Sequence, residues 1–347
     1  MSRILEVDEL RGLVGRIFAA AGCETDEARR IAGYLVEANL VGHDSHGVIR
    51  VPTYIDWLLA DKVVANQSIE IVTENDSLAV VDGRFGFGQT IGEQAVRLGI
   101  DKAQKSGVAA IALRNSGHLG RIGDWPLLAA RAGLVSLHFV NTSGMGMLVA
   151  PFGGITRRMS ACPIAAGVPL ADDEPIILDV SMATIAEGKI RVAFNKGVPV
   201  PDGCIIDSAG QPTNDPRVFY ADPPGAILPI AGHKGSGLAF ITEVFAGAMT
   251  GGSCTSPEHA SRLANGMFSI YFKPEFFAPD QAFQTEMRRF IEFVKSAEKT
   301  TPGGEILVPG EIELRTRAAR SARGIELDDN TWAQIEATCR KLGFGAA

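Results

Sequence analysis

The segment VAAIALRNSGHLGRIG, residues 108–123, joins an apolar run to a polar, glycine-rich stretch. Residues 108–113 are typical of a buried strand, and residues 115–123 follow that strand directly. Open α/β sheets bind their ligands beyond the carboxyl ends of strands. We therefore expect a binding loop here, with His118 as a candidate acid–base residue and Gly120 as a place where a cofactor can approach the backbone. A solvated connection between a strand and a helix is the alternative.

Strands and helices alternate on both sides of this segment, which is typical of an α/β domain. Short apolar runs predict further strands at residues 69–73, 78–81, 134–140, 176–180 and 267–272. Helical spacing predicts helices at residues 90–105, 124–132 and 235–247. Residues 195–229 are dense in glycine and proline, so we expect a long ordered loop there. The α/β unit is assigned to residues 69–275.

Both ends of the chain are predicted to be helical. Apolar residues recur at helical spacing in residues 7–20, 25–40, 54–60, 281–299 and 331–341. We expect residues 1–68 to form the first part of a helical domain. Residues 276–347 are expected to supply C-terminal helices that pack back on it, which makes the helical domain discontinuous.

The composition narrows the partners and the compartment. The chain has 347 residues, of which 46% are hydrophobic, and a formal net charge of −7. This charge argues against nucleic acid and anionic membranes as partners, because both require basic patches. The five cysteines form no CxxC pair, and neither a signal peptide nor an apolar run long enough to span a bilayer is found. We expect a cytoplasmic protein that binds no nucleic acid or membrane.

The segment GHDSHGVIR, residues 42–50, carries the chemistry that a 2-oxo acid reductase requires. Such an enzyme needs a proton donor for the developing alkoxide and a cation that orients the carboxylate. His46 can supply the first, with Ser45 beside it, and Arg50 can supply the second through a two-pronged hydrogen bond. Tyr54 follows at helical spacing and is expected in the same substrate pocket, although Pro52 disfavours one continuous helix.

Two other interpretations of this segment stay open. Asp44 or Ser45 can simply cap a helix, which is a common role for these residue types. His43, Asp44 and His46 can also suggest the site of a metal-dependent hydrolase or lyase, although two histidines three residues apart are a weak signal for a metal. We predict no metal site.

Glycine-rich turns offer further cofactor contacts. Residues 83–88 and 232–237 each precede a helix, so that their amides can bind phosphate oxygens. Neither turn fits GxGxxG, which argues against a standard Rossmann turn. Lys234 is either a phosphate or carboxylate contact or an ordinary surface lysine. Asp179 either accepts from ribose hydroxyls or caps a helix.

Seven segments in order resemble the malate/L-lactate dehydrogenase family, which also includes sulfolactate, ureidoglycolate and Δ1-piperideine-2-carboxylate enzymes. They are DSHGVIRVPTY (44–54), NSGHLG (115–120), APFGG (150–154), ILD (177–179), IDSAGQPT (206–213), HKGSGL (233–238) and LVPGE (307–311). The chain departs from the family at residues 160–163, where SACP stands for the usual Gly-Thr-Asn-Pro. This change is expected to shape the pocket for a different substrate side chain.

The resemblance implies the fold, the reaction and the assembly. It implies an α/β protein with a non-Rossmann, mixed-sheet cofactor domain and a helical domain built from both chain termini. The implied reaction is hydride transfer between NAD, with NADP possible, and C2 of a small 2-hydroxy or 2-oxo carboxylic acid of the malate, lactate or aryl-lactate type. Reduction of cyclic imino acids is the alternative. Members of the family are typically homodimers.

The same resemblance implies roles for particular residues. His46 is implied as the acid–base residue assisted by Ser45, with Arg50 on the substrate carboxylate, and His118 matches the histidine that some members use instead. The implied cofactor contacts are His46, Gly120, Arg121, Ile122, Asp179, Val180, Ser181, His233, Lys234, Asn265, Gly310 and Glu311.

Overall fold

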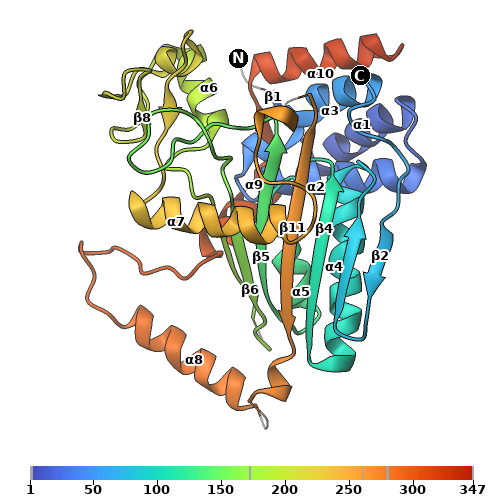
Figure 1. Ribbon diagram of the computed structural model, residues 1–347, viewed down its shortest axis with the longest axis vertical. Helices are drawn as coiled ribbons and strands as arrows, with labels where there is room; N and C mark the ends of the chain where they lie inside the picture. The colour runs from blue at the N-terminus through green and yellow to red at the C-terminus, as the bar shows by residue number, and fades with distance from the viewer. Residues whose placement is uncertain (1–2, 172, 260, 279–280, 346–347) are drawn as a thin grey trace.

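A mixed seven-stranded sheet forms the centre of the protein in a computed structural model, which describes residues 3–171, 173–259, 261–278 and 281–345 (Figure 1). In sheet order the strands are β2 (Glu70–Glu74), β3 (Leu78–Asp82), β4 (Val108–Ser116), β11 (Leu263–Phe272), β5 (Val135–Gly144), β6 (Ile164–Val168) and β7 (Ile176–Val180). Strands β3 and β4 run parallel, whereas the other neighbouring pairs are antiparallel. The predicted mixed α/β architecture is confirmed.

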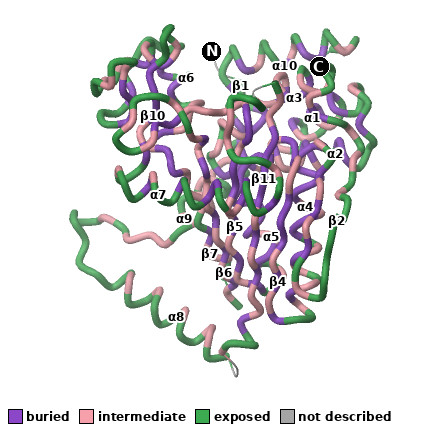
Figure 2. The backbone as a smooth tube through the Cα atoms, in the orientation of Figure 1, coloured by how far each residue is buried: buried purple, intermediate pink, exposed green. Residues whose placement is uncertain are grey.

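Helices cover the sheet on both faces (Figure 1). α4 (Gly88–Ser106) contacts β4 and β11, and α5 (Asp124–Arg131) contacts β5 and β6. Trp125, on α5, is fully buried in the main core of this unit. α7 (His233–Thr242) continues into a π-helical stretch, Glu243–Ala248, which contacts β5 and β11 from the other face. Figure 2 shows the buried residues concentrated along these central strands.

The two ends of the chain meet in a helical layer beside the sheet (Figure 1). The helices are α1 (Val7–Ala20), α2 (Thr25–Leu40), α3 (Val51–Leu59), α9 (Glu311–Arg323) and α10 (Asp329–Lys341). α9 contacts α2, and α10 contacts α3. Strand β1 (Arg3–Leu5) pairs antiparallel with β12 (Ile325–Leu327), so that the first and last elements of the chain are joined by backbone hydrogen bonds.

Residues 195–229 are more regular than the long loop that their sequence predicts. This region contains a three-stranded sheet of β10 (Ala226–Ile227), β8 (Ile205–Ile206) and β9 (Pro212–Thr213), preceded by α6 (Glu187–Lys196). Dispersed apolar residues such as Ile205 and Phe219 form a separate small core there. Strands of two residues leave no periodicity to detect, which is why the sequence pattern did not predict them.

Helix α8 (Ala282–Lys295) lies away from the other C-terminal helices (Figure 1). None of its residues is buried (Figure 2), although it was expected to pack on the helical domain. The side chain of Gln284 does contact the body, through hydrogen bonds with the backbone of Pro169 and Ala171. The domain boundaries at residues 68 and 275 stay a prediction.

Within the part of the chain that the structure describes, no helix is both long enough and apolar enough to cross a membrane.

Candidate active site

The segment that carries His46 forms two short 3-10 turns between α2 and α3, Asp44–His46 and Val48–Arg50. Helix α3 begins at Val51, so Pro52 lies in its first turn, where the missing N–H of proline is not needed. Pro52 therefore starts a helix, and the single helical face through His46, Arg50 and Tyr54 does not exist.

Asn39 on α2 shapes these turns with a buried side-chain amide. Its Oδ1 accepts from the backbone N–H of Val48 at 2.8 Å, and its Nδ2 donates to Asp44 Oδ1 at 2.7 Å. A Cβ atom at Gly47 would lie 2.1 Å from Asn39 Oδ1, far closer than real Cβ contacts. A side chain at position 47 would therefore displace Asn39 from these hydrogen bonds.

The C-terminal helix α9 holds the same turn from outside. Arg320 donates to both carboxylate oxygens of Asp44, at 2.6 and 3.0 Å, and to the backbone carbonyl of Asn39 at 2.5 Å. The His43 ring contacts Glu313 at 3.3 Å. Asp44 and His43 thus serve contacts with α9, and they do not converge on His46. Among the described residues, no group of three or more His, Cys, Asp or Glu side chains could hold a metal ion.

His118 lies in the loop that follows β4, and this loop is held by the sheet. Asn265 on β11 accepts from the backbone N–H of Leu119 at 2.8 Å and donates to the carbonyl of Asn141 at 2.8 Å. At the start of α4, a Cβ atom on Gly88 would lie 2.1 Å from the backbone oxygen of His118. The backbones of the helix and the loop are therefore in direct contact, and this contact holds His118 in place.

Five of the predicted residues meet at one place. The rings of His46 and His118 are nearly parallel, with centroids 5.7 Å apart. Ser45 Oγ lies 3.0 Å from His46 Nδ1, and the Tyr54 hydroxyl lies 2.6 Å from His118 Nδ1. Arg50 Nε donates to the carbonyl of Ser45 at 2.6 Å. The cluster brings together two imidazoles, the hydroxyls of Ser45 and Tyr54, and the guanidinium of Arg50.

Burial and nearby cations keep both imidazoles neutral. Each ring retains some accessible surface, yet enough protein surrounds His46 for burial to lower its pKa to about 3, with Arg50, His43 and Arg121 adding to the effect. Burial, Arg50 and His46 lower the pKa of His118 in the same direction. An anion that neutralised the charge of Arg50 would raise both pKa values.

Arg121 and Asp179, both expected at the cofactor, meet at the start of α5. Arg121 forms a buried ion pair with Asp124 at 2.7 Å, and the backbone N–H of Gly123 donates to Asp179 at 2.7 Å. Burial raises the pKa of Asp124 to about 6, although Arg121 opposes the shift. The Nε of Arg121 is buried and has no hydrogen-bond partner among the described residues.

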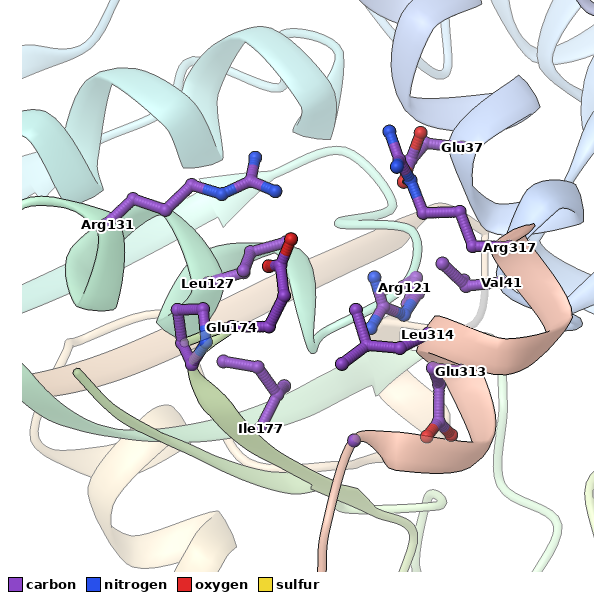
Figure 3. A pocket seen from close by; sticks show the side chains of 12 residues that line it. Glu37, Val41, Arg121, Leu127, Arg131, Glu174, Ile177, Glu313, Leu314 and Arg317 are labelled. Atoms are coloured by element: carbon purple, nitrogen blue, oxygen red, sulfur yellow. The ribbon is translucent and has the colours of Figure 1, made fainter. Parts of the chain in front are cut away.

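An open hollow lies beside Arg121, between α2, α5, β7 and α9 (Figure 3). Gly310, another expected cofactor residue, lines it. Figure 3 shows the Glu174 and Arg131 side chains extending into the hollow from one side, and the paired Glu37 and Arg317 at the other. The remaining charged lining residue is Glu313.

Other expected cofactor residues lie apart from the histidine pair. His233 and Lys234 are exposed at the start of α7, where the His233 ring packs edge-on against Phe152 at 5.7 Å. Ser181, beyond the end of β7, donates to the carbonyl of Ala161. Glu311 accepts from the backbone N–H of Val308 at 3.0 Å. In the described part of the chain, no contact joins any of these side chains to His46 or His118.

The unusual SACP segment contacts a buried glutamate. Cys162 Sγ lies 3.4 Å and Ser160 Oγ 3.5 Å from the Glu243 carboxylate, which also accepts from Asn141 at 2.8 Å. Both side chains therefore help to join the π-helical stretch to the sheet.

Sequence reasoning missed several residues around the site. Asn39, Gln89, Asp124 and Arg320 each contact a predicted residue or its turn. Asn39 and Asp124 lie in predicted helices but carry no predicted role, and Gln89 and Arg320 lie outside the predicted elements. No local pattern distinguishes them, because their partners lie up to 281 residues away in the chain.

Three comparisons with known proteins agree with one another. The sequence model described as malate/L-lactate dehydrogenase matches residues 5–336. The chain is 41% identical to hydroxycarboxylate dehydrogenase B of Escherichia coli K12 over 98% of this chain and 94% of that protein. It is similar to the structure of sulfolactate dehydrogenase from Methanocaldococcus jannaschii, with 33% identity, a TM-score of 0.87, and coverage of 99% and 98%.

The structure of Δ1-piperideine-2-carboxylate reductase from Pseudomonas syringae is also similar. Its TM-score is 0.84 at 28% identity, covering 97% of this chain and 99% of that one.

Proposed function

The chain belongs to the malate/L-lactate dehydrogenase family, a family of oxidoreductases that act on 2-hydroxy acids, and we propose that it transfers a hydride between NAD and C2 of a small 2-hydroxy or 2-oxo carboxylic acid. The observation that carries this proposal is the cluster of Arg50 with the paired imidazoles of His46 and His118. It combines a carboxylate-binding cation with proton-exchanging groups.

The residues expected at the cofactor suit a dinucleotide. Arg121 has a buried, unpartnered Nε, and Gly123 occupies only one oxygen of Asp179. Gly120 and Gly310 have φ angles of +71° and +98°, which favour glycine. Because glycine has no side chain, a ligand can approach the backbone at both positions. NAD bound there would supply the hydride acceptor in oxidation and the hydride donor in reduction.

The charges around Arg121 favour NAD over NADP. An arginine that binds a 2′-phosphate must have an uncompensated positive charge, but Arg121 is already paired with Asp124. The hollow beside it is lined by Arg131 and Arg317 as well as by Glu37, Glu174 and Glu313, so it adds no net positive charge for a further phosphate. We therefore expect tighter binding of NADH than of NADPH.

Arg50 is proposed to orient the substrate. Its Nε is occupied by the carbonyl of Ser45, which leaves the two terminal nitrogens for a carboxylate. Carboxylate binding would neutralise the charge that helps to keep the imidazoles neutral, so their pKa values would rise when substrate binds. A histidine of the pair can then donate its proton to the substrate oxygen during reduction, or take it during oxidation.

The substrate side chain is proposed to be short and uncharged. A small hollow adjoins His118, and its other lining residues are Tyr54, Trp57, Val63 and Phe87. None of these side chains supplies a cation for a second carboxylate. A pyruvate-type acid therefore fits this surface better than a dicarboxylate.

A homodimer in the cytoplasm is proposed as the working form. Helix α8 exposes Phe290 and Phe293, and α7 exposes Phe240 and Ile241, which are large apolar side chains that a second copy can cover. All five cysteines, each within the described residues, are free, as expected in a reducing compartment. Sedimentation analysis of wild-type protein and a Phe290→Glu, Phe293→Glu double variant tests the assembly. Equal monomeric mass for both would contradict it.

The function is tested with pyruvate, oxaloacetate, phenylpyruvate and glyoxylate, each with NADH and NADPH. Arg50→Met should mainly raise KM and also lower kcat. A lost charge-assisted contact costs about 1.5–3 kcal/mol, so kcat/KM should fall by about 10- to 150-fold. Arg29→Met, at an exposed ion pair with Asp26, is the control. Unchanged kcat/KM for Arg50→Met would remove its role, and turnover of a cyclic imine alone would favour the imino acid reductase.

A further inference from the structure

Two donors face Nδ1 of His118. The Tyr54 hydroxyl lies 2.6 Å from this nitrogen, and the backbone N–H of Gly120 points at it from 3.3 Å. A backbone N–H can only donate, so a proton on Nδ1 would face another N–H. Nδ1 is therefore placed as an acceptor.

The surroundings of Tyr54 agree with this direction. Gln89, whose side chain is buried, donates from Nε2 to the Tyr54 oxygen at 3.4 Å. The tyrosine oxygen thus accepts from one side, and its own proton is directed at His118 Nδ1. Burial raises the pKa of Tyr54 to about 12, so the phenol keeps that proton at neutral pH.

His46 has a different neighbour. Its Nδ1 lies 3.0 Å from Ser45 Oγ, and a hydroxyl can either donate or accept. His46 can therefore gain or lose a proton while it keeps this hydrogen bond. His118 cannot be protonated on Nδ1 without opposing the N–H of Gly120. In the described part of the chain, neither ring has a protein partner at Nε2.

We infer that His118 is held as the neutral tautomer with its proton on Nε2 and serves as a hydrogen-bond donor to the substrate oxygen, whereas His46 exchanges the proton. Tyr54 and Gln89 are positioning residues that hold this tautomer. The inference rests on the proposed function. During reduction, hydride adds to C2, the C–O double bond becomes single, and the His46 proton passes to that oxygen, which leaves His46 neutral. A fixed donor such as His118 stabilises the charge that develops on the oxygen.

The tautomer can be measured without substrate or cofactor. Protein carrying ¹⁵N-histidine is examined by long-range ¹H–¹⁵N NMR at neutral pH, and His118→Gln identifies the His118 signals by their loss. We expect a protonated Nε2 and an unprotonated Nδ1. A proton on Nδ1, alone or together with one on Nε2, would overturn the inference.

Two further variants test the positioning residues. Tyr54→Phe removes the stronger donor to Nδ1, and Gln89→Met removes the group that directs the hydroxyl. Tyr54→Phe should give mixed tautomer signals for His118, because only the longer contact with Gly120 remains, and Gln89→Met should give a smaller change. Both should leave the signals of His46 in place. If both kept the wild-type signals of His118 at unchanged unfolding temperature, Tyr54 and Gln89 would be structural only.

The pH dependence of kcat separates the two histidines. The charges of Arg50, His43 and Arg121 act on His46, and those of Arg50 and His46 act on His118, so both rings share one electrostatic environment. His46→Gln should lower kcat by about 10²–10⁴-fold and abolish the limb that the proton donor produces. His118→Gln should lower kcat by about 10²–10³-fold and keep that limb. The reverse pattern would overturn the assignment. Absence of turnover with every 2-oxo acid would refute the proposed function, while the NMR result would still decide the tautomer.

Discussion

The two sides of the histidine pair are supported in different ways. The His46 turn is held by side chains, namely the amide of Asn39 and the ion pair between Asp44 and Arg320. The His118 loop is held by the side chain of Asn265 on β11 and, in addition, by close backbone contact with α4. Salt can screen the ion pair on the His46 side, whereas the backbone contact on the His118 side cannot move without shifting the loop. We therefore expect the His118 side to tolerate change less well.

The largest effect is expected from Gly88→Ala. The new Cβ would lie 2.1 Å from the backbone oxygen of His118, which cannot move without shifting the loop. We expect a loss of about 3 kcal/mol or more in unfolding free energy, at the upper end of overpacking costs. Urea unfolding measures it. Gly15→Ala, in a helix and with nothing within 4 Å of its new Cβ, is the control and should stabilise by up to about 1 kcal/mol. A Gly88→Ala protein as stable as wild type would break the comparison.

A smaller loss is expected from Gly47→Ala. Its Cβ would lie 2.1 Å from Asn39 Oδ1, which belongs to a side chain that can rotate away at the loss of its hydrogen bonds. We expect about 1–3 kcal/mol. Combining Gly47→Ala with Asn39→Ala should cost less than the two single changes added together, because the second removes the obstacle. Strict additivity in this double-mutant cycle would show that Asn39 is not the contact that matters.

We expect acid to lower the stability of the fold through His138, which lies on β5 in the central sheet. This ring is fully buried between Ser269 Oγ at 2.8 Å and Ser136 Oγ at 3.0 Å, and burial lowers its pKa to about 3. The unfolded chain takes up the proton below a pH of about 6.5, so stability from the neutral ring is present above that pH and lost as pH falls toward 3.

The expected slope is about 1.4 kcal/mol per pH unit below about 6.5. Urea unfolding of wild type and of His138→Gln between pH 7 and about pH 5 isolates it, because His46 and His118 remain in both proteins. Parallel stability curves for the two proteins would rule out His138 as the source.

The smallest effect is expected from Arg320→Ala on the helical side. Its side chain is 30% exposed and that of Asp44 is 52% exposed, so water and salt weaken their attraction. We expect a loss of about 1 kcal/mol or less, a fall of a few-fold in kcat, and a smaller difference from wild type at high salt. Arg340→Ala, at an ion pair with Glu336 on α10, is the control. A loss as large as that of Gly88→Ala would contradict the ranking.

Periodicity predicted the elements that bury a regular face. Helix α2 and the strand at 108–113 were predicted because their apolar residues recur at fixed spacing over many residues. Helix α9 was missed because its sequence is strongly polar and no residue in it is buried, so that it carries no apolar stripe. Strand β6 was missed because alanine and glycine fill its buried positions.

The candidate site was predictable only where its residues are neighbours in sequence. Ser45, His46 and Arg50 lie in one segment, and the combination of these residue types suggested their chemistry. The contact of Tyr54 with His118 spans 64 residues and that of Arg320 with Asp44 spans 276. Such contacts depend on how whole elements pack, which no local pattern contains.

The pairing of β1 with β12 has a consequence for how the chain is made. The last strand of the central sheet, β11, ends at Phe272, so the sheet can form while the ribosome is still adding residues. Arg320 and β12 emerge later, yet they clamp a turn and a strand that were synthesised first. Each new molecule therefore acquires a firm His46 turn only at the end of translation, and a nascent chain stalled before residue 320 would carry a folded sheet beside an unfinished catalytic turn.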